Sequence, residues 1–431
     1  MRTFWEYLYS FVVIPLLWVL LQLAGLVDRK VRRGIRGRAG LEETLRAQMS
    51  SLAPGTRVWF HASSMGEFEQ AKPIIAELKR RHPGTQVITT FFSPSGYDHS
   101  RTYRLADVIS YLPFDSRAGA RMFVETVRPT VAVMVRYDVW PNHIWELQRR
   151  GIPAMIANAT MRSTTPRRLP VVRSFHHHLY NAIDSILTVS ASDVHAFRTF
   201  HLTRPSMAAI GDTRYDQVSQ RSAEARRKRI IPDRIVGGKK VIVAGSTWPE
   251  DEQVLLPAFL RLQSQGNNIL LILVPHEPTV SHLEELEADL RGKTTFIRFS
   301  GLNEYGGEQV IIVDSIGILL TLYAYAQLAY VGGSFRQGVH NVLEAAVYGI
   351  PVLFGPRHRN SQEPLHLVEH GGGFVVNTTE ELHRALDNLL NDDSARTVAG
   401  DRALKFVQSN IGATKRFLEH LEPYLHPTGG T

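Results

Sequence analysis

The sequence alternates short apolar runs with longer segments of helical periodicity, and it does so in two separate series. The runs are rich in β-branched residues, which is typical of buried parallel strands joined by helices. The first series of runs is 58–61, 86–92, 131–135, 153–157 and 185–189, and the second is 241–244, 269–274, 310–313, 329–331 and 352–354. The helical segments include 67–81 and 117–126. The pattern therefore predicts an α/β fold with two Rossmann-like, doubly wound domains.

Breaks in this pattern suggest the domain boundaries. We expect a membrane anchor and basic junction at 1–40, an N-terminal Rossmann-like domain at 41–218, and a charged linker with Pro232 and paired glycines at 219–240. A C-terminal Rossmann-like domain follows at 241–405, and a helical tail at 406–431 can pack back on the N-terminal domain. Ligands of open α/β sheets bind at the carboxyl ends of the strands, so two such domains are expected to face each other across a cleft.

The N-terminus carries an apolar segment, 11–27, with the sequence FVVIPLLWVLLQLAGLV. Trp5, Tyr7 and Tyr9 precede it and the basic stretch DRKVRRGIRGR follows it, which is typical of a membrane anchor with its cationic end in the cytoplasm. A helix of this length would measure about 26 Å, slightly short of the hydrocarbon core. Spanning and interfacial insertion both fit, and Pro15 and Gln22 leave a buried core helix as the alternative.

Composition limits the partners. The formal net charge of +8 indicates an anionic partner, either a membrane surface, a nucleic acid or a phosphorylated substrate. No aromatic-interleaved basic motif accompanies the charge, so we do not expect nucleic-acid binding. The chain has no cysteine, which excludes disulfides, thiolate nucleophiles and Cys-ligated zinc.

The stretch 330–356, YVGGSFRQGVHNVLEAAVYGIPVLFGP, combines a glycine turn, a helix and a returning strand. Gly332 and Gly333 allow positive φ and a close approach of a ligand to the backbone. A helix predicted to begin near His340 or Asn341 would favour a phosphate at its N-terminus, and Glu344 could accept hydrogen bonds from a ribose diol. The alternative is an ordinary strand–helix–strand unit in which Asn341 only caps the helix.

A second polar stretch, HASSMGEFEQA at 61–71, follows the first predicted strand. Ser63 or Ser64 can cap the next helix, and Gly66 permits a tight approach. Glu67 would then face the ligand site as a general base. The alternative is that Glu67 and Glu69 only stabilise the helix dipole.

Several motifs together resemble one family, the 3-deoxy-D-manno-octulosonic acid (Kdo) transferases of lipopolysaccharide assembly. The resemblance covers nearly the whole chain. The motifs are ASSMGEFEQ at 62–70, SPSG at 93–96, YLPFD at 111–115, VWPN at 139–142, GDTRYD at 211–216, AGSTWPEDE at 244–252, DSIG at 314–317, and the block from VGGSF to FGP at 331–356.

The resemblance implies a GT-B fold and an inverting glycosyl transfer that needs no metal and no cofactor. The donor would be CMP-Kdo and the acceptor a lipid A precursor of the lipid IVA type, at a membrane surface with anionic lipids. The enzyme would be held on the cytoplasmic side of the inner membrane. Glu67 matches the family's catalytic base. The expected donor contacts are Ser246, Thr247, His276, Gly332, Gly333, Ser334, Asn341 and Glu344, and the expected acceptor or cleft residues are Ser64, Gly66, Ser93, Arg214, Asn360 and Glu363.

The chain departs from the family pattern at a few positions. His276 stands where many members have an arginine, Arg136 and Asp138 replace an acidic pair before WPN, and Ile318 replaces a glutamate. For Arg214 a surface salt bridge is an equally good interpretation. The alternative functions are another GT-B nucleotide-sugar transferase or epimerase, and a membrane-attached sugar-binding scaffold without catalysis.

Overall fold

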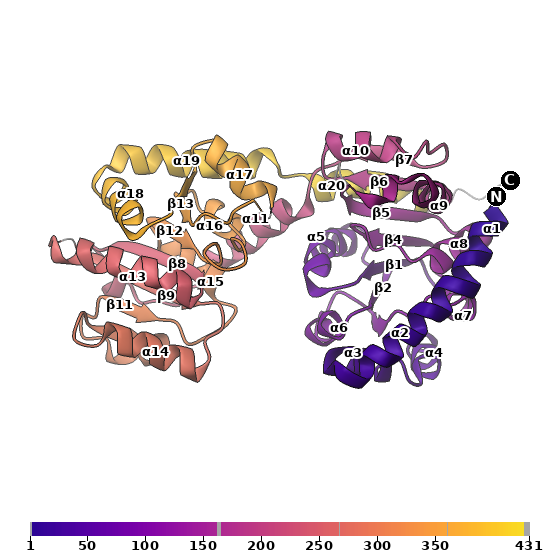
Figure 1. Cartoon of the computed structure of the whole chain (residues 1–431), viewed down its shortest axis with the longest axis horizontal. Helices are drawn as coiled ribbons and strands as arrows, with labels where there is room; N and C mark the ends of the chain where they lie inside the picture. Colours follow the sequence, from indigo (N-terminus) through magenta and orange to yellow (C-terminus); the bar gives the residue numbers. More distant parts are fainter. Residues whose placement is uncertain (1, 162–164, 267, 360, 426–431) are drawn as a thin grey trace. The chain divides into compact units, whose positions relative to one another are not determined.

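The computed structural model describes residues 2–161, 165–266, 268–359 and 361–425, and the chain forms two compact units (Figure 1). Unit 1 comprises Met1–Gln217 and Gly412–Thr431, and unit 2 comprises Val218–Ile411. Unit 2 is therefore inserted into unit 1, and the last helix of the chain belongs to the first unit.

Unit 1 is built on a parallel sheet with the strand order β3-β2-β1-β4-β5-β6-β7. Its strands are β1 (Arg57–Ala62), β2 (Gln86–Phe91), β3 (Val108–Tyr111), β4 (Val131–Val135), β5 (Ala154–Ala159), β6 (Ser185–Thr188) and β7 (Ser206–Ala209). Strand β1 pairs with both β2 and β4. The chain runs from β1 to one edge and then returns to β4, so the topological switch point, where α/β sheets bind ligands, lies between β1 and β4.

Helices cover both faces of this sheet. Successive residues of a strand point to opposite faces, so Trp59 and Phe60 belong to different hydrophobic clusters. The helices of unit 1 are α1 (Arg2–Leu8), α2 (Ile14–Val27), α3 (Arg29–Arg36), α4 (Leu41–Ser50), α5 (Met65–Arg81), α6 (Pro94–Ser100), α7 (Arg117–Val127), α8 (Pro141–Arg149), α9 (Pro170–Tyr180), α10 (Ala191–Arg198) and α20 (Ala413–Leu425), and α11 (Thr213–Ala225) leads into unit 2.

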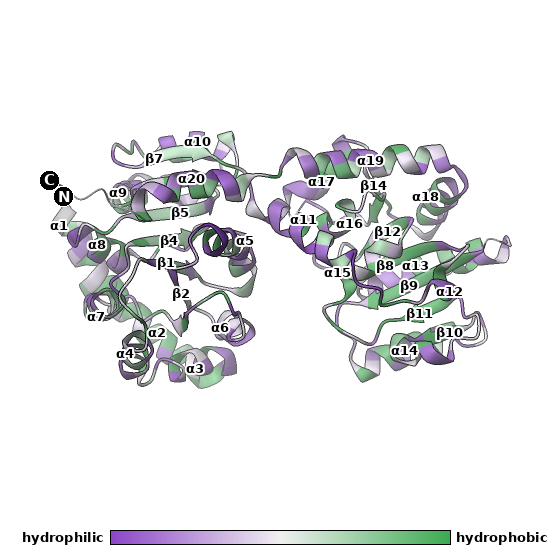
Figure 2. Cartoon of the chain, turned by 180° about the vertical axis from the view of Figure 1, so that it is seen from behind, coloured by the Kyte–Doolittle hydropathy of each residue, from purple (hydrophilic) through white to green (hydrophobic). Residues whose placement is uncertain are grey.

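Unit 2 repeats the architecture, with the strand order β10-β11-β9-β8-β12-β13-β14 and its switch point between β8 and β12. The strands are β8 (Lys240–Thr247), β9 (Ile269–Pro275), β10 (Phe296–Arg298), β11 (Val310–Ile312), β12 (Leu328–Val331), β13 (Val352–Phe354) and β14 (Gly373–Val375). The helices are α12 (Asp233–Val236), α13 (Pro249–Ser264), α14 (Val280–Leu290), α15 (Leu319–Leu322), α16 (Leu343–Ala346), α17 (Gln362–Glu369), α18 (Thr379–Asn391) and α19 (Asp393–Ser409). Figure 2 shows the central strands β8, β9 and β11 as hydrophobic, as expected for a sheet buried on both faces.

The predicted α/β class and each predicted strand are confirmed. The sequence pattern did not predict β3, β7, β10 or β14, which are the outermost strands of the two sheets. The segment 219–240, predicted as a linker, is partly helical, since α11 continues to Ala225 and α12 follows.

Residues Phe4–Val27 form one helix that is long and apolar enough to cross a membrane. It contains a π-helical turn, Tyr9–Val13, just before Pro15. Proline has no N–H to donate, and such local widening lets a helix accommodate it. The exposed apolar side chains of this helix are Phe4, Tyr7, Phe11, Val12, Leu16, Leu17, Trp18, Val19, Leu20, Leu23, Leu26 and Val27.

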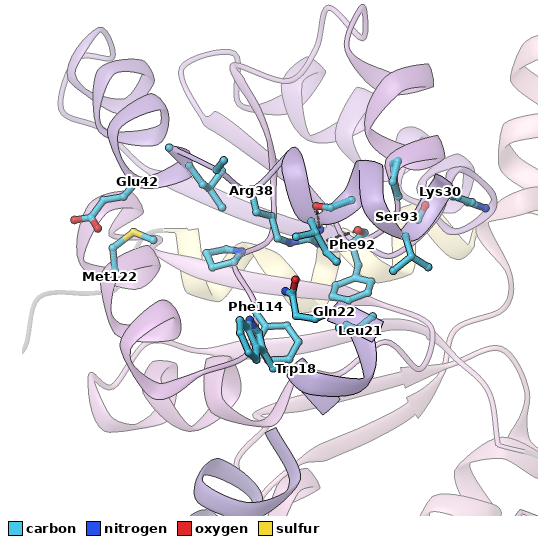
Figure 3. A pocket seen from close by; sticks show the side chains of 18 of the residues that line it. Trp18, Leu21, Gln22, Lys30, Arg38, Glu42, Phe92, Ser93, Phe114 and Met122 are labelled. Carbon is cyan, nitrogen blue, oxygen red and sulfur yellow. Dashed lines mark hydrogen bonds between the residues drawn. The ribbon is translucent and has the colours of Figure 1, made fainter. Parts of the chain in front are cut away.

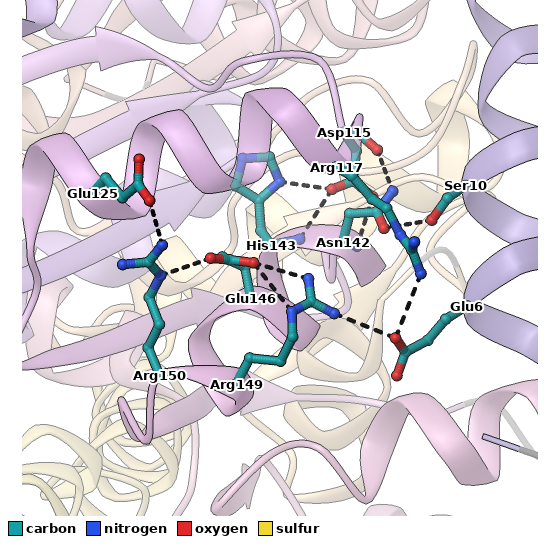
Figure 4. A network of polar contacts seen from close by, with 10 residues as sticks. All are labelled: Glu6, Ser10, Asp115, Arg117, Glu125, Asn142, His143, Glu146, Arg149 and Arg150. Carbon is teal, nitrogen blue, oxygen red and sulfur yellow. Dashed lines mark hydrogen bonds and ion pairs between the residues drawn. The ribbon is translucent and has the colours of Figure 1, made fainter. Parts of the chain in front are cut away.

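Polar contacts fasten the first half of this helix to the rest of unit 1 (Figure 4). The Tyr9 hydroxyl donates to Asp115 Oδ2 at 2.9 Å, and the Ser10 hydroxyl donates to Asn142 Oδ1 at 2.7 Å. The Glu6 carboxylate lies 3.3 Å from the Arg149 guanidinium. Buried polar groups need such partners, so these contacts fix which side of the helix faces the protein.

Candidate functional site

The carboxyl ends of β1 and β2 bring two of the predicted motifs together in unit 1. The Ser93 N–H donates to the Ser63 carbonyl oxygen at 2.9 Å. A Cβ on Gly96 would lie 2.8 Å from the Phe91 ring and 3.2 Å from the Ser64 carbonyl carbon, so only glycine permits this approach. Ser93 also caps α6, because its hydroxyl accepts from the Gly96 N–H at 3.1 Å.

Glu67 lies in the first turn of α5 and is buried. Its Oε2 accepts the Ser64 N–H at 2.7 Å and also contacts the Ser64 hydroxyl. This contact is one half of a capping box. Through Oε2, Glu67 therefore has the helix-stabilising role that was the alternative to a general base. Among the described residues, Oε1 of Glu67 has no hydrogen-bond partner. One carboxylate oxygen is therefore positioned and the other is available.

A polar cluster that the sequence did not predict lies beside the same switch point. His61 Nε2 is 2.9 Å from Asp138 Oδ2 and 3.0 Å from Trp140 Nε1, and Ser63 Oγ also contacts Asp138. His61 Nδ1 is 2.9 Å from the Thr90 hydroxyl. His61 is the residue before the last of β1 and Asp138 follows β4, so their position at the ends of neighbouring strands was the signal available in the sequence.

The other residues predicted for the acceptor site are placed as follows. Arg214 binds Asp212 through its Nε and Nη2 atoms at 2.9 and 2.7 Å, which is the salt bridge considered as an alternative. The nearest atom to a Cβ built on Gly66 would be Ser64 Oγ at 3.9 Å, so this position is open. Glu363 is buried in the first turn of α17, in unit 2. Asn360 lies outside the described residues.

In unit 2, Gly332 and Gly333 follow β12 as predicted, but their missing Cβ atoms serve the protein's own packing. A Cβ on Gly332 would lie 2.4 Å from the Ser246 carbonyl oxygen and 2.7 Å from Thr247 Cα. Gly333 has φ +94°, and its Cβ would lie 2.5 Å from the Gly338 carbonyl oxygen. The glycines thus let the loops after β8 and β12 touch each other, and the close approach of a ligand at this turn stays a prediction.

Two further donor-site candidates have their hydroxyls bonded inside the unit. The Thr247 hydroxyl donates to Glu252 Oε1 at 2.7 Å, and the Ser334 hydroxyl accepts the Gly355 N–H at 2.6 Å. Both residues are fully buried. Asp251 holds the glycine turn by accepting the Gly333 N–H at 2.8 Å, and burial raises the pKa of this carboxyl. The loops at this edge are therefore fixed by internal polar groups.

Ser246 differs from these residues. It has φ +54°, an uncommon left-handed conformation for a serine. Its hydroxyl is partly exposed and has no hydrogen-bond partner in the part of the chain that the structure describes. Such outliers cluster at ligand sites, where surrounding structure holds them in place.

A stack of aromatic and cationic side chains adjoins Ser246. The imidazoles of His276 and His340 are stacked with ring centroids 4.3 Å apart, and Trp248 lies 4.8 Å from the His276 ring. The Arg336 guanidinium lies 4.2 Å from the centroid of the Trp248 ring, in a cation–π contact. Of this group, the sequence predicts only His276 as a donor contact.

His340 is electrically neutral at physiological pH. Partial burial and the neighbouring His276 lower its pKa to about 4. Its Nε2 accepts the Trp248 indole N–H at 3.0 Å, as a neutral imidazole can. Arg336 is therefore the permanent positive charge of the stack.

The helix after the glycine turn begins later than predicted. Helix α16 starts at Leu343, not near His340, because the preceding chain bonds across the loop through Val339 N–H to Arg357 O and His340 N–H to Gly332 O. Asn341 Oδ1 accepts the Leu343 N–H at 3.2 Å, which is a capping role. Glu344 Oε1 lies 4.0 Å from the Arg221 guanidinium.

The sequence of the chain is similar to those of known transferases. Residues 33–217 match the family model described as 3-deoxy-D-manno-octulosonic-acid transferase (kdotransferase). The chain is 28% identical to the 3-deoxy-D-manno-octulosonic acid transferase of Haemophilus influenzae, over 98% of this chain and 99% of that protein. It is 30% identical to the enzyme of the same name from Aquifex aeolicus, over 78% of this chain and 86% of that protein.

A solved structure confirms the GT-B type of fold. UDP-GlcNAc 2-epimerase from Neisseria meningitidis, with UDP-GlcNAc bound, superposes with a TM-score of 0.60 at 14% identity, covering 85% of this chain and 100% of that chain. At this identity the likeness concerns the fold alone.

Proposed function

Because the chain belongs to the family of 3-deoxy-D-manno-octulosonic acid (Kdo) transferases, which are glycosyltransferases, we propose that it transfers Kdo from CMP-Kdo to a lipid A precursor of the lipid IVA type. The observation that carries the proposal is similarity to named Kdo transferases over nearly the whole chain. The product would enter lipopolysaccharide assembly.

Glu67 is the proposed general base. Its Oε2 is fixed by Ser64, so Oε1 is the atom that accepts the proton of the attacking acceptor hydroxyl. As the hydroxyl oxygen bonds to the anomeric carbon of Kdo, the bond from that carbon to the CMP phosphate breaks and CMP leaves with the electron pair. Direct displacement of this kind inverts the anomeric configuration.

The donor is proposed to bind in unit 2 at the edge that carries Ser246. The free Ser246 hydroxyl can donate to a phosphate oxygen, and the exposed His276 lies in the same stack of rings. Arg336 supplies a fixed cation that can offset the charge of the departing phosphate. We assign to Arg336 the charge that the family arginine provides where this chain has His276.

The N-terminal helix is proposed to lie in the membrane interface on the cytoplasmic side of the inner membrane. Trp5 Nε1 donates to Ser174 Oγ at 3.2 Å near one end, and a Cβ on Gly25 would lie 2.9 Å from Ile35 near the other. A helix whose first half is held to unit 1 through Trp5, Tyr9 and Ser10 would have to break these contacts in order to span. Its exposed apolar face and the basic helix α3 suit the lipid boundary and anionic headgroups.

The test is a transfer assay on the full chain in phospholipid nanodiscs, with CMP-Kdo, a tetra-acylated lipid A precursor and EDTA. We expect the acceptor mass to increase by one or more Kdo units. A folded, CMP-binding protein that adds no Kdo would overturn the proposal. Transfer that stops when EDTA is added would overturn its metal-independent form.

A further inference from the structure

Unit 1 contains a cavity of about 920 Å³ between the N-terminal helices and the loops after β2 and β3 (Figure 3). Trp18 and Leu21 of α2, Phe92 and Phe114 of the loops, and Met122 of α7 form apolar walls. The volume lies within the range of pockets that hold small ligands, about 300–1,000 Å³. Trp18 lines the cavity and is also half exposed on the apolar face of α2. The cavity therefore adjoins the surface proposed to contact lipid.

Three polar side chains that line the cavity, Gln22, Lys30 and the Glu43 carboxylate, have no hydrogen-bond or ion-pair partner among the described residues. The Gln22 amide has no hydrogen-bond partner among the described residues, although it lies in an otherwise apolar helix (Figure 3). Lys30 is exposed and, within the described part of the chain, has no ion-pair partner. An amide among apolar walls suits the ester or amide carbonyl that joins an acyl chain to its headgroup, and an unpaired ammonium suits a headgroup phosphate.

Arg38 also lines the cavity, but its guanidinium is already hydrogen-bonded to the protein backbone. Its guanidinium donates to the carbonyl oxygens of Leu112, Phe92 and Gly34 at 2.7–2.8 Å. Burial lowers its pKa to about 10, so it remains charged at neutral pH. Arg38 therefore fixes the cavity wall. The third lining cation, Arg46, is paired with Glu42 at 2.6 Å, so Lys30 is the lining cation without an ion-pair partner among the described residues.

Contacts connect the cavity to the edge that carries Glu67. Ser93 lines the cavity and donates its N–H to Ser63. The Phe92 ring is stacked on Trp140 at 4.5 Å, and Trp140 Nε1 lies 3.0 Å from His61 Nε2. A ligand whose apolar part fills the cavity would thus present its polar part near the loop after β1.

We propose that this cavity binds an acyl chain of the glycolipid acceptor and so positions the acceptor sugar at the Glu67 edge. This inference deepens the proposed function and rests on it for the identity of the lipid. Membrane phospholipids offer the same acyl chemistry, so the experiments must separate the two sources.

The first experiment compares two substitutions on one helix in the full chain. Leu21→Trp fills the cavity, and Leu23→Trp places the same side chain on the exposed face of α2 as a matched control. We expect Leu21→Trp to raise KM for the tetra-acylated acceptor about tenfold, the change in affinity that accompanies the loss of about two buried methylene groups. KM for CMP-Kdo should not change. Equal KM values for the acylated acceptor in the two variants would overturn the proposal.

The second experiment needs no turnover, so it separates failure of the cavity from failure of Kdo transfer. The chain is reconstituted with phosphatidylglycerol that carries a diazirine near the end of one acyl chain, irradiated and mapped by mass spectrometry. We expect adducts at Met122 or Phe114 that Leu21→Trp reduces and that added tetra-acylated acceptor displaces. Adducts confined to exposed residues of α2 would show that the cavity does not bind an acyl chain. Cavity adducts that the acceptor does not displace would show that the bound acyl chain is not that of the acceptor.

Discussion

Glu67 serves the helix and the proposed chemistry with different oxygen atoms. Glu67→Gln keeps an oxygen to accept the Ser64 N–H but removes the base, so we expect the fold to persist while turnover falls about 10²–10⁴-fold. Transfer kinetics and CMP calorimetry check this, with CMP affinity unchanged. Glu69→Gln, on the same turn but bonded to Lys72, is the matched control and should retain activity. Unchanged turnover in Glu67→Gln would remove this residue from the base role.

Ser246, a proposed donor-site residue, has a left-handed backbone conformation. Ser246→Gly removes both the hydroxyl and the cost of φ +54°, but glycine loses more backbone entropy on folding, so the free energy of unfolding should rise by only about 0.5–1 kcal/mol while CMP binds about fivefold more weakly. Ser246→Ala removes only the hydroxyl, so it should weaken CMP binding without stabilising the chain. Urea unfolding and CMP calorimetry measure the two effects. If Ser246→Gly were less stable than Ser246→Ala, the relieved strain would be smaller than the entropy that glycine loses on folding, and the expectation would fail.

His340 makes stability depend on pH. Its pKa is about 4 in the folded chain but near the ordinary 6.5 in the unfolded chain, which therefore takes up the proton more readily. This stabilisation is present above pH 6.5 and is lost as the pH falls from about 6.5 to 4. His340→Gln keeps an acceptor for the Trp248 N–H but does not titrate in this range. The urea midpoint of unit 2 should fall less between pH 7.5 and 5 in this variant than in the parent, and equal decreases would contradict the assignment.

At the scale of residues, the sequence predicts where the motifs lie but not which atoms of their side chains form which contacts. Loops at strand ends were recognised from Ser64, Gly333 and their neighbours, since strand-end position follows from the alternation of elements. The partners were not predictable, because they come from distant segments. Ser334 bonds to Gly355, and the Trp248 ring packs at a tilt against His276.

At the scale of elements, the N-terminal helix is tied down by its buried hydroxyls. Tyr9→Phe leaves a buried oxygen of Asp115 without its Tyr9 donor and should lower the free energy of unfolding of unit 1 by about 1–2 kcal/mol. Asp115 keeps bonds from Asn142 and His143, which limits the loss. Tyr7→Phe, with its ring half exposed, is the control and should be nearly neutral in urea unfolding. Equal losses in both variants would argue against the polar attachment.

Element prediction was reliable for central strands and failed at the edges. β7 (Ser206–Ala209) and β10 (Phe296–Arg298) are short and have no fully buried residue, so they lack the apolar run that marks a buried strand. Edge strands bury less surface than central ones and are commonly short. The start of α16 was mispredicted because tertiary bonds of Val339 and His340 replace local helix bonds.

At the scale of the whole molecule, the proposed interfacial helix fixes membrane topology. The chain has no cysteine, so single cysteines can be labelled without background. We expect a membrane-impermeant maleimide to label Phe4→Cys in inverted inner-membrane vesicles and not in spheroplasts. Ser50→Cys, in α4, should behave identically because it lies on unit 1. Labelling of Phe4→Cys from the periplasmic side would show that the helix spans.

The return of α20 to unit 1 has a consequence for biosynthesis. Phe417, Leu418 and Leu421 are fully buried in the same cluster as Val58 and Ile74, although they are encoded at the far end of the chain. The core of unit 1 therefore stays incomplete while the ribosome translates all of unit 2. Domains usually fold in order of synthesis, but here the later unit can finish first. The nascent chain would expose apolar surface of unit 1 until α20 has been synthesised.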